Sequence, residues 1–150
     1  MRPHSNYPTV EFRMCDCCTS LKDAVSIAAL IQALVAKVIT LRKSNQQWRS
    51  YRGSLIHENK WRSAQKGVES NLIDFGLGKE VPFKDLISEM LEFIDDVVDD
   101  LGTKKYIDNI LRISKEGSSA DRQIEIYDKT GKMKDVVDFL IDETTRHCIK

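Results

Sequence analysis

Polar and apolar residues alternate near the start of the chain. The apolar positions of this segment are Val10, Phe12 and Met14. The opposite face is polar and carries Glu11 and Arg13. This period of two predicts a β-strand over about residues 8–15. Because a lone strand leaves half of its backbone groups unpaired, we expect it to find no sheet within this chain and to join strands supplied from elsewhere.

The rest of the chain follows mainly a helical period. Thr19 or Ser20 can cap a helix that is apolar on nearly every side over 21–41, which is typical of a core helix. A polar loop or frayed helix end follows over 42–52, and a turn is expected at 76–78. Further helices are predicted over 58–66, 82–101, 104–114, 120–127 and 133–144. One clear strand with five to six helices predicts a helix-rich α+β fold.

Composition narrows the classes of partner. The chain has 150 residues, about one domain, with 23 basic and 23 acidic residues and a formal net charge of zero. The net charge of the chain therefore produces no overall electrostatic attraction to nucleic acid or anionic lipid. The longest apolar stretch, 24–38, is interrupted by polar residues and is shorter than the roughly 20 residues that span a bilayer. We expect a cytoplasmic protein that binds neither a membrane nor nucleic acid.

Glu11 and Arg13 are the first candidates for chemistry. Two positions apart on one strand face, their side chains stand about 7 Å apart at the backbone. They can form an ordinary surface ion pair, which is a common and weak interaction. They can also act on a nucleotide, because carboxylate oxygens suit Mg²⁺ and a guanidinium matches phosphate oxygens. The pattern alone leaves both interpretations open.

Several motifs together resemble a known family. They are Arg2-Pro3-His4, the segment 7–16, the alanine-rich helix 21–35, the segment 57–64, Leu101-Gly102, the segment 117–123, the segment 136–140 and Glu143-Thr144. In this order they resemble the later half of the ATP-dependent carboxylate–amine ligases known as type 2 glutamate–cysteine ligases. The Glu-x-Arg strand before an alanine-rich helix is also similar to glutamine synthetase, whose fold this family is understood to share.

The resemblance implies that residues 1–150 are the C-terminal portion of a single glutamine synthetase-like catalytic domain whose N-terminal half is absent. It implies an ATP-dependent ligase of glutathione biosynthesis that needs Mg²⁺ or Mn²⁺. The substrates would be glutamate and an amino-acid amine such as cysteine, joined through a γ-glutamyl phosphate. We expect the isolated chain to be incomplete or inactive, and to pair with a separate N-terminal half or form a homo-oligomer.

The resemblance also assigns roles near the strand. Glu11 would bind the metal ion. Arg13 would be catalytic and would contact the nucleotide, stabilising the transferring phosphoryl group or holding a substrate carboxylate. Arg2 would assist in binding substrate or phosphate.

Two later segments receive roles by the same resemblance. Asn59 and Arg62, three apart on one side of a helix, would contact the nucleotide or substrate, although a solvated helix face explains them nearly as well. Gln65 stands where the family usually carries an arginine. The turn at 117–123 makes Arg122 a catalytic or interface residue with Asp121 orienting it, while the same turn is also typical of a routine helix N-cap.

Three other interpretations of the chain remain. The first is a non-catalytic helical interaction or dimerisation module derived from the ligase. The second is RNA binding by a basic and aromatic patch made of Arg42, Lys43, Trp48, Arg49 and Tyr51, which the charge balance disfavours. The third is a zinc site at Cys15, Cys17 and Cys18 with His147 or Cys148, which lacks the paired spacing of zinc sites.

Overall fold

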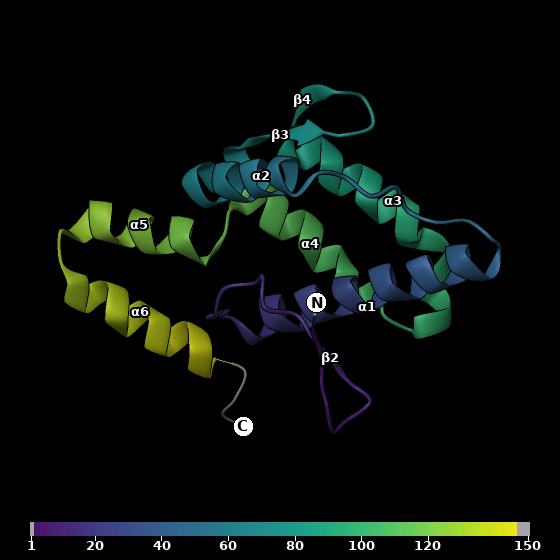
Figure 1. Cartoon of the computed structure of the whole chain (residues 1–150). Helices are drawn as coiled ribbons and strands as arrows, with labels where there is room; N and C mark the ends of the chain where they lie inside the picture. The colour runs from purple at the N-terminus through teal and green to yellow at the C-terminus, as the bar shows by residue number, and fades with distance from the viewer. Residues whose placement is uncertain (1, 147–150) are drawn as a thin grey trace.

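The computed structural model describes residues 2–146 and consists mainly of helices (Figure 1). The helices are α1 (Leu21–Lys43), α2 (Gly53–Lys66), α3 (Phe83–Leu101), α4 (Lys104–Glu116), α5 (Ser119–Thr130) and α6 (Met133–Thr145), with a 3-10 turn, η1 (Gly67–Glu69), after α2. Two antiparallel hairpins pair β1 (Arg2–Pro3) with β2 (Val10–Glu11) and β3 (Asn71–Asp74) with β4 (Lys79–Pro82). The predicted helix-rich α+β class is confirmed.

The N-terminal strand is shorter than its sequence pattern predicts. Of the predicted segment 8–15, only Val10–Glu11 forms a strand. The expectation that it finds no partner in the chain is wrong, because β2 pairs with β1 and places Arg2 opposite Glu11. The ladder is limited because Pro3 has no N–H to donate. The alternating pattern therefore fixes which side chains share a face but not the length of the ladder.

The apolar core lies between α1, α3 and α4. Its buried residues are Ala29 and Ala33 of α1, Ile94, Val97 and Val98 of α3, and Ile107 of α4. The alanines of α1 are small, so the two other helices approach this side of α1 closely. Ser26, also on this side, satisfies its hydroxyl by donating to the carbonyl oxygen of Lys22 at 2.7 Å. A stripe of small residues thus determines which face of α1 is buried.

The other faces of α1 are largely uncovered, which corrects the expectation of a helix buried all round. Its exposed large apolar residues include Leu21, Val25, Val38 and Ile39. The difference arises because α3 and α4 pack mainly against one side of α1. Composition alone had suggested complete burial, whereas burial depends on how many partners surround the helix.

α1 also has the length and composition of a membrane-crossing helix, the only such helix among residues 2–146. An 18-residue window has a mean hydropathy of 2.1, and 17% of that window is buried. Within this fold α1 packs on α3 and α4 through its small residues, and its Lys37 forms an ion pair with Asp96 of α3 at 2.6 Å. These contacts fix one side of α1 against α3 and α4.

The remaining helices and the turn at 76–78 agree with prediction, except that α2 begins at Gly53 and not at residue 58. Ser20 caps α1, its hydroxyl accepting from the backbone N–H of Asp23. The polar segment after α1 is a loop up to α2, and residues 76–78 lie between β3 and β4. α3 ends at Gly102, whose left-handed backbone (φ 64°) suits glycine and allows the sharp turn into α4.

α5 and α6 form a separate helical hairpin beside the core, drawn at the left of Figure 1. Much of its apolar surface is exposed, at Ile124, Tyr127, Met133, Val137 and Ile141. The polar contacts that join this hairpin to α1 are described below.

We expect Ile94→Ala to lower the free energy of unfolding by about 2–5 kcal/mol, because Ile94 is fully buried at the centre of the core and its removal leaves a cavity. Chemical denaturation of the full chain measures this. Leu77→Ala is the control, since Leu77 is 64% exposed and its loss should cost less than about 0.5 kcal/mol. Equal effects of the two substitutions would contradict this description of the core.

Candidate functional site

The β1–β2 hairpin presents the first group of candidate residues. Two backbone hydrogen bonds close its turn. The N–H of His4 donates to the carbonyl oxygen of Thr9 at 3.0 Å, and the N–H of Thr9 donates to the carbonyl oxygen of Tyr7 at 2.7 Å. The rings of His4 and Tyr7 lie 5.0 Å apart across it. These contacts stabilise the connection between β1 and β2, in addition to the two-residue ladder.

Glu11 and Arg13 meet on the solvent face of this ribbon. Arg13 Nε lies 3.1 Å from Glu11 Oε1, and the two side chains are 67% and 52% exposed respectively. Arg2 pairs with Glu11 across the hairpin, so these two side chains share a face. The predicted proximity of Glu11 and Arg13 is confirmed. An exposed ion pair contributes only about 0–1 kcal/mol to stability, so the pair adds little to the fold.

The ribbon offers part of a cation shell. Glu11 Oε1 contacts Arg13, while Oε2 has no protein partner within residues 2–146. No group of three or more His, Cys, Asp or Glu residues within that range is arranged to hold a metal ion. Mg²⁺ takes about six oxygen ligands and commonly uses only one or two carboxylates, with phosphates and water completing the shell. Glu11 therefore fits as one ligand of such an ion, with the other ligands supplied from outside these residues.

Asn59 joins α2 to the second hairpin. Its Nδ2 donates to the carbonyl oxygen of Ile73 at 2.9 Å, and its Oδ1 accepts from the backbone N–H of Ile73 at 2.7 Å. The amide thus takes the place of a neighbouring strand along the edge of β3. The interpretation of this position as a solvated helix face is wrong, because both polar groups of the side chain are used within the chain.

Arg62 reaches the same hairpin one turn later. Its Nε contacts Glu58 Oε1 at 2.8 Å, and its Nη1 contacts Glu80 Oε1 of β4 at 2.8 Å. With two carboxylates around it, this guanidinium is neutralised locally. Asn59 and Arg62 do face the same side, as predicted, and in this structure that side is the β3–β4 hairpin.

Arg122 lies in a different part of the molecule, between three helices. Its Nε contacts Glu143 Oε1 of α6 at 2.9 Å, and its Nη2 contacts Asp23 Oδ2 of α1 at 3.2 Å. Nη1 is buried and has no hydrogen-bond partner within residues 2–146. The guanidinium therefore connects the α5–α6 hairpin to the start of α1.

Asp23 is the centre of this network. It is 7% exposed, and its Oδ1 accepts from Asn109 Nδ2 at 3.0 Å and also from Arg112 Nη2. Burial alone would raise the pKa of the Asp23 carboxyl, but the Asn109 hydrogen bond and the Arg112 and Arg122 charges outweigh it and lower that pKa below its ordinary value of 3.8. The carboxylate thus stays ionised between two guanidinium groups.

The turn before α5 acts as a helix cap. Asp121 Oδ2 accepts from the backbone N–H of Ser118 at 2.6 Å and from its hydroxyl at 2.8 Å. Gly117 has φ 97°, and a Cβ there would approach Asp121 to 2.9 Å. The N-cap interpretation is confirmed, and the expectation that Asp121 orients Arg122 is wrong. Asp23 and Glu143 orient Arg122 instead.

Three separate places therefore hold the predicted site residues. Arg2, Glu11 and Arg13 lie on the first hairpin, Asn59 and Arg62 on α2, and Arg122 on α5. Figure 1 shows α2 and β2 on opposite sides of the core, and no hydrogen bond or ion pair within residues 2–146 joins the three groups. Any single reaction centre would need further chain between them.

The cysteines give no metal centre in the described part of the chain. Cys15 and Cys17 are exposed, Cys18 is half-buried, and all three are free thiols. Burial, followed by the Asp23 charge, raises the pKa of the Cys18 thiol, which opposes thiolate formation. His147 and Cys148, which the zinc interpretation needs, lie outside the described residues.

Sequence reasoning missed Asp23 and Arg112 as partners. Asp23 follows a serine cap, so its position in the first turn of a helix already has a local explanation. Arg112 lies 89 residues further along the chain, and no short-range spacing connects the two. The available signal was the spacing of Asn109 and Arg112, which lie three apart and therefore on one side of a predicted helix.

Comparisons with known proteins agree with the resemblance. Residues 1–139 match the model of glutamate-cysteine ligase family 2. Curated relatives named "Putative glutamate--cysteine ligase 2" are 47% identical in Solibacter usitatus over 96% of this chain, and 48% identical in Herpetosiphon aurantiacus over 95% of it. The matched region is 37% of each relative, so the chain spans little more than a third of their length. No solved structure matches the chain.

We expect Asp23→Asn to destabilise the fold by about 2–3 kcal/mol at neutral pH, because it leaves two guanidinium groups without their carboxylate. The folded-state pKa of Asp23 is lowered, so its contribution is present above pH 3.8 and disappears as the pH falls through the folded-state pKa. The difference between wild type and Asp23→Asn should therefore shrink in acid.

Denaturation at pH 7 and at pH values below 3.8 tests this expectation. Asp108→Asn on the exposed side of α4 is the matched control and should change stability little at either pH. A difference between wild type and Asp23→Asn that stays constant down to low pH would contradict an ionised Asp23.

Proposed function

This chain belongs to glutamate-cysteine ligase family 2, and from that membership we propose that it is the C-terminal portion of an ATP-dependent carboxylate–amine ligase. The observation that carries the proposal is the contact of Glu11 with Arg13 on an exposed ribbon, within the matched region. The pair is accessible and contributes little to stability, so it is free to serve a ligand. We propose that the protein is cytoplasmic and acts without a membrane or nucleic acid partner.

The proposed reaction has two steps. An oxygen of the γ-carboxylate of glutamate attacks the γ-phosphorus of ATP, the bond to the β,γ-bridging oxygen breaks, and ADP leaves. The amine of cysteine, or of a related amino acid, then attacks the resulting acyl phosphate, loses a proton, and displaces inorganic phosphate to leave an amide. Both steps concentrate negative charge on phosphoryl oxygens, which is why cationic groups are the expected catalytic equipment.

The hairpin residues have complementary roles in this proposal. Arg13 offers a planar guanidinium that can bind two phosphoryl oxygens at once and stabilise the charge that develops there. Glu11 contacts Arg13 and would supply one oxygen ligand to Mg²⁺ or Mn²⁺. A divalent cation bound there would neutralise phosphate charge and help to orient ATP. Arg2, opposite Glu11 on the same face, adds a second positive charge to this surface.

The other predicted residues act at a greater distance from this surface. Arg122 is engaged with Asp23 and Glu143, so we propose that it is a positioning residue that holds the α5–α6 hairpin. Asn59 and Arg62 hold the β3–β4 hairpin against α2. We propose that the remaining part of the ligase domain brings substrate to these elements, and that this chain by itself is incomplete or inactive.

We expect Glu11→Gln to reduce ADP release by about 100-fold or more, because the change keeps the shape of the side chain but removes a charged metal ligand. The assay uses this chain co-expressed with the upstream part of the Solibacter usitatus relative, supplied with ATP, Mg²⁺, glutamate and a panel of amino acids. Glu92→Gln on α3 is the control, since Glu92 is exposed and lies far from the hairpin in sequence. Unchanged turnover in Glu11→Gln would reject the metal role.

Arg13→Lys should also lose most of the rate, because an ammonium cannot reproduce the two-pronged contact of a guanidinium with phosphate. The same ADP-release assay measures it, with Arg42→Lys at the exposed end of α1 as the control. Near-normal kinetics in Arg13→Lys would rule out the proposed phosphate contact.

One outcome would favour the alternative function. If the chain folds cooperatively, forms a complex and yet neither binds ATP with Mg²⁺ nor supports ADP release, it is a non-catalytic interaction or dimerisation module. The exposed apolar residues of α5 and α6 provide the surface that such a module would use.

A further inference from the structure

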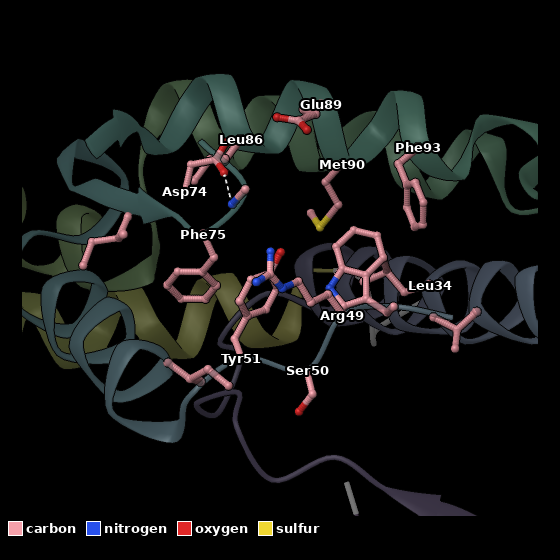
Figure 2. A pocket seen from close by; sticks show the side chains of 15 residues that line it. Leu34, Arg49, Ser50, Tyr51, Asp74, Phe75, Leu86, Glu89, Met90 and Phe93 are labelled. Carbon is pink, nitrogen blue, oxygen red and sulfur yellow. Dashed lines mark hydrogen bonds between the residues drawn. The ribbon is translucent and has the colours of Figure 1, made fainter. Parts of the chain in front are cut away.

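Two features of the described residues lie outside the candidate site. One is an open apolar groove of about 680 Å³ between α1, the loop before α2, the β3–β4 hairpin and α3 (Figure 2). Its lining includes Trp48 and Tyr51, which the sequence also suggested as part of an RNA-binding patch. The other is a set of hydrogen bonds around Thr19, which joins the α5–α6 hairpin to the chain just before α1. The second feature acts on the segment that carries Glu11 and Arg13.

The β1–β2 hairpin and the segment after it have no polar contact with the helices before Thr19. Among residues 2–146, the hydrogen bonds and ion pairs of residues 2–18 all join residues of that same segment. Residues 12–19 form neither helix nor strand. Thr19 is therefore the first residue after Arg13 that is hydrogen-bonded to another part of the molecule. How firmly Thr19 is held thus affects the orientation of Arg13 relative to the helices.

Two helices hold Thr19 by its side chain and by its backbone. Its Oγ1 lies 2.7 Å from Ser119 Oγ of α5 and also contacts Glu143 Oε2 of α6. Its backbone carbonyl oxygen accepts from Thr144 Oγ1 of α6 at 3.0 Å. The partners lie 100, 124 and 125 residues further along the chain, so these contacts exist only in the assembled fold.

The hydroxyl groups at this point form one directed chain of hydrogen bonds. A carboxylate only accepts, so Thr19 donates its single hydroxyl proton to Glu143 and accepts from Ser119. Ser119 in turn accepts from Gln123 Nε2 at 3.0 Å. The other carboxylate oxygen of Glu143 accepts from Arg122 Nε at 2.9 Å. Each hydroxyl both donates and accepts, and such chains strengthen their members because each bond polarises the next.

We propose that Thr19 is a positioning residue for Arg13. Its hydroxyl, held between Ser119 and Glu143, fixes the segment 12–19 and so directs the Arg13 guanidinium towards the phosphoryl groups of the proposed reaction. This inference rests on the proposed function, because it gives Arg13 the phosphate contact stated there. The α5–α6 hairpin thereby acts on the proposed site, although within residues 2–146 it forms no hydrogen bond or ion pair with Arg13.

The test removes the hydroxyl of Thr19 while keeping the shape of the side chain. Thr19→Val breaks the chain of hydrogen bonds, and Thr19→Ser keeps the hydroxyl. In NMR relaxation of the full chain, the order parameter of the Arg13 amide should fall by about 0.2 in Thr19→Val and stay within about 0.05 of wild type in Thr19→Ser. Thr40→Val is the matched control, because Thr40 is exposed near the other end of α1 and should leave Arg13 unaffected.

A second variant and a kinetic measurement complete the test. Ser119→Ala removes only the donor to Thr19 and places a good helix former in the first turn of α5, so it should fold and lower the same order parameter by a smaller amount. In the ADP-release assay, Thr19→Val should lower kcat about tenfold and change the KM for ATP less than about twofold, because a misdirected Arg13 weakens contacts made in the transition state. Thr19→Ser should recover most of the rate.

The outcomes separate this inference from the proposed function. An Arg13 order parameter that is unchanged in Thr19→Val and Ser119→Ala overturns the inference, and so does a loss that also appears in Thr19→Ser or a normal kcat in Thr19→Val. If Thr19→Val does not fold, the order parameter in Ser119→Ala decides. If the order parameter falls as expected but the wild-type mixture releases no ADP, the positioning of Arg13 by Thr19 stands and the proposed activity fails.

Discussion

A buried carboxylate at the start of α1 is central to the contacts that join the α5–α6 hairpin to the rest of this structure. Asp23, at the start of α1, lies between Arg112 of α4 and Arg122 of α5. Arg122 in turn contacts Glu143 of α6. The buried apolar core lies between α1, α3 and α4, so these charged contacts, together with hydrogen bonds between Thr19 and the α5–α6 hairpin, position the hairpin on the rest of the molecule. Such pairs cost free energy to desolvate, and their geometry is specific in a way that apolar contacts are not.

Most of the predicted polar site residues stabilise the fold, whereas several apolar surfaces of the molecule are exposed. Asn59, Arg62 and Arg122 are all engaged by other parts of the chain, whereas several large apolar residues of α1 are exposed to solvent. Glu11 and Arg13 are the exception, since they meet on an exposed ribbon that has little structural need for them. This division is the basis for our proposal that the first hairpin binds a ligand.

The fold was predictable where local physical chemistry decides it. The amphipathic pattern of α3 and the glycine after it defined that helix almost to the residue, and Ser20, one of the two caps that the sequence suggested, caps α1. The predicted strand was less accurate, because a ladder needs a partner and β1 offers only two residues. Within the candidate site, the contact between Glu11 and Arg13 was predictable because the two residues lie only two positions apart and carry opposite charges, although Arg13 lies just beyond the strand that the structure forms.

The sequence by itself determined the secondary structure, the family and the neighbouring positions of Glu11 and Arg13, since each depends on residues close together along the chain. Only the tertiary structure decided that Asp23 pairs with both Arg112 and Arg122, and that Arg122 connects α5 to α1 and α6. It alone also decided that α1 is covered on one side. These facts depend on which helices pack together across separations of more than 80 residues, and that packing is a property of the whole folded chain.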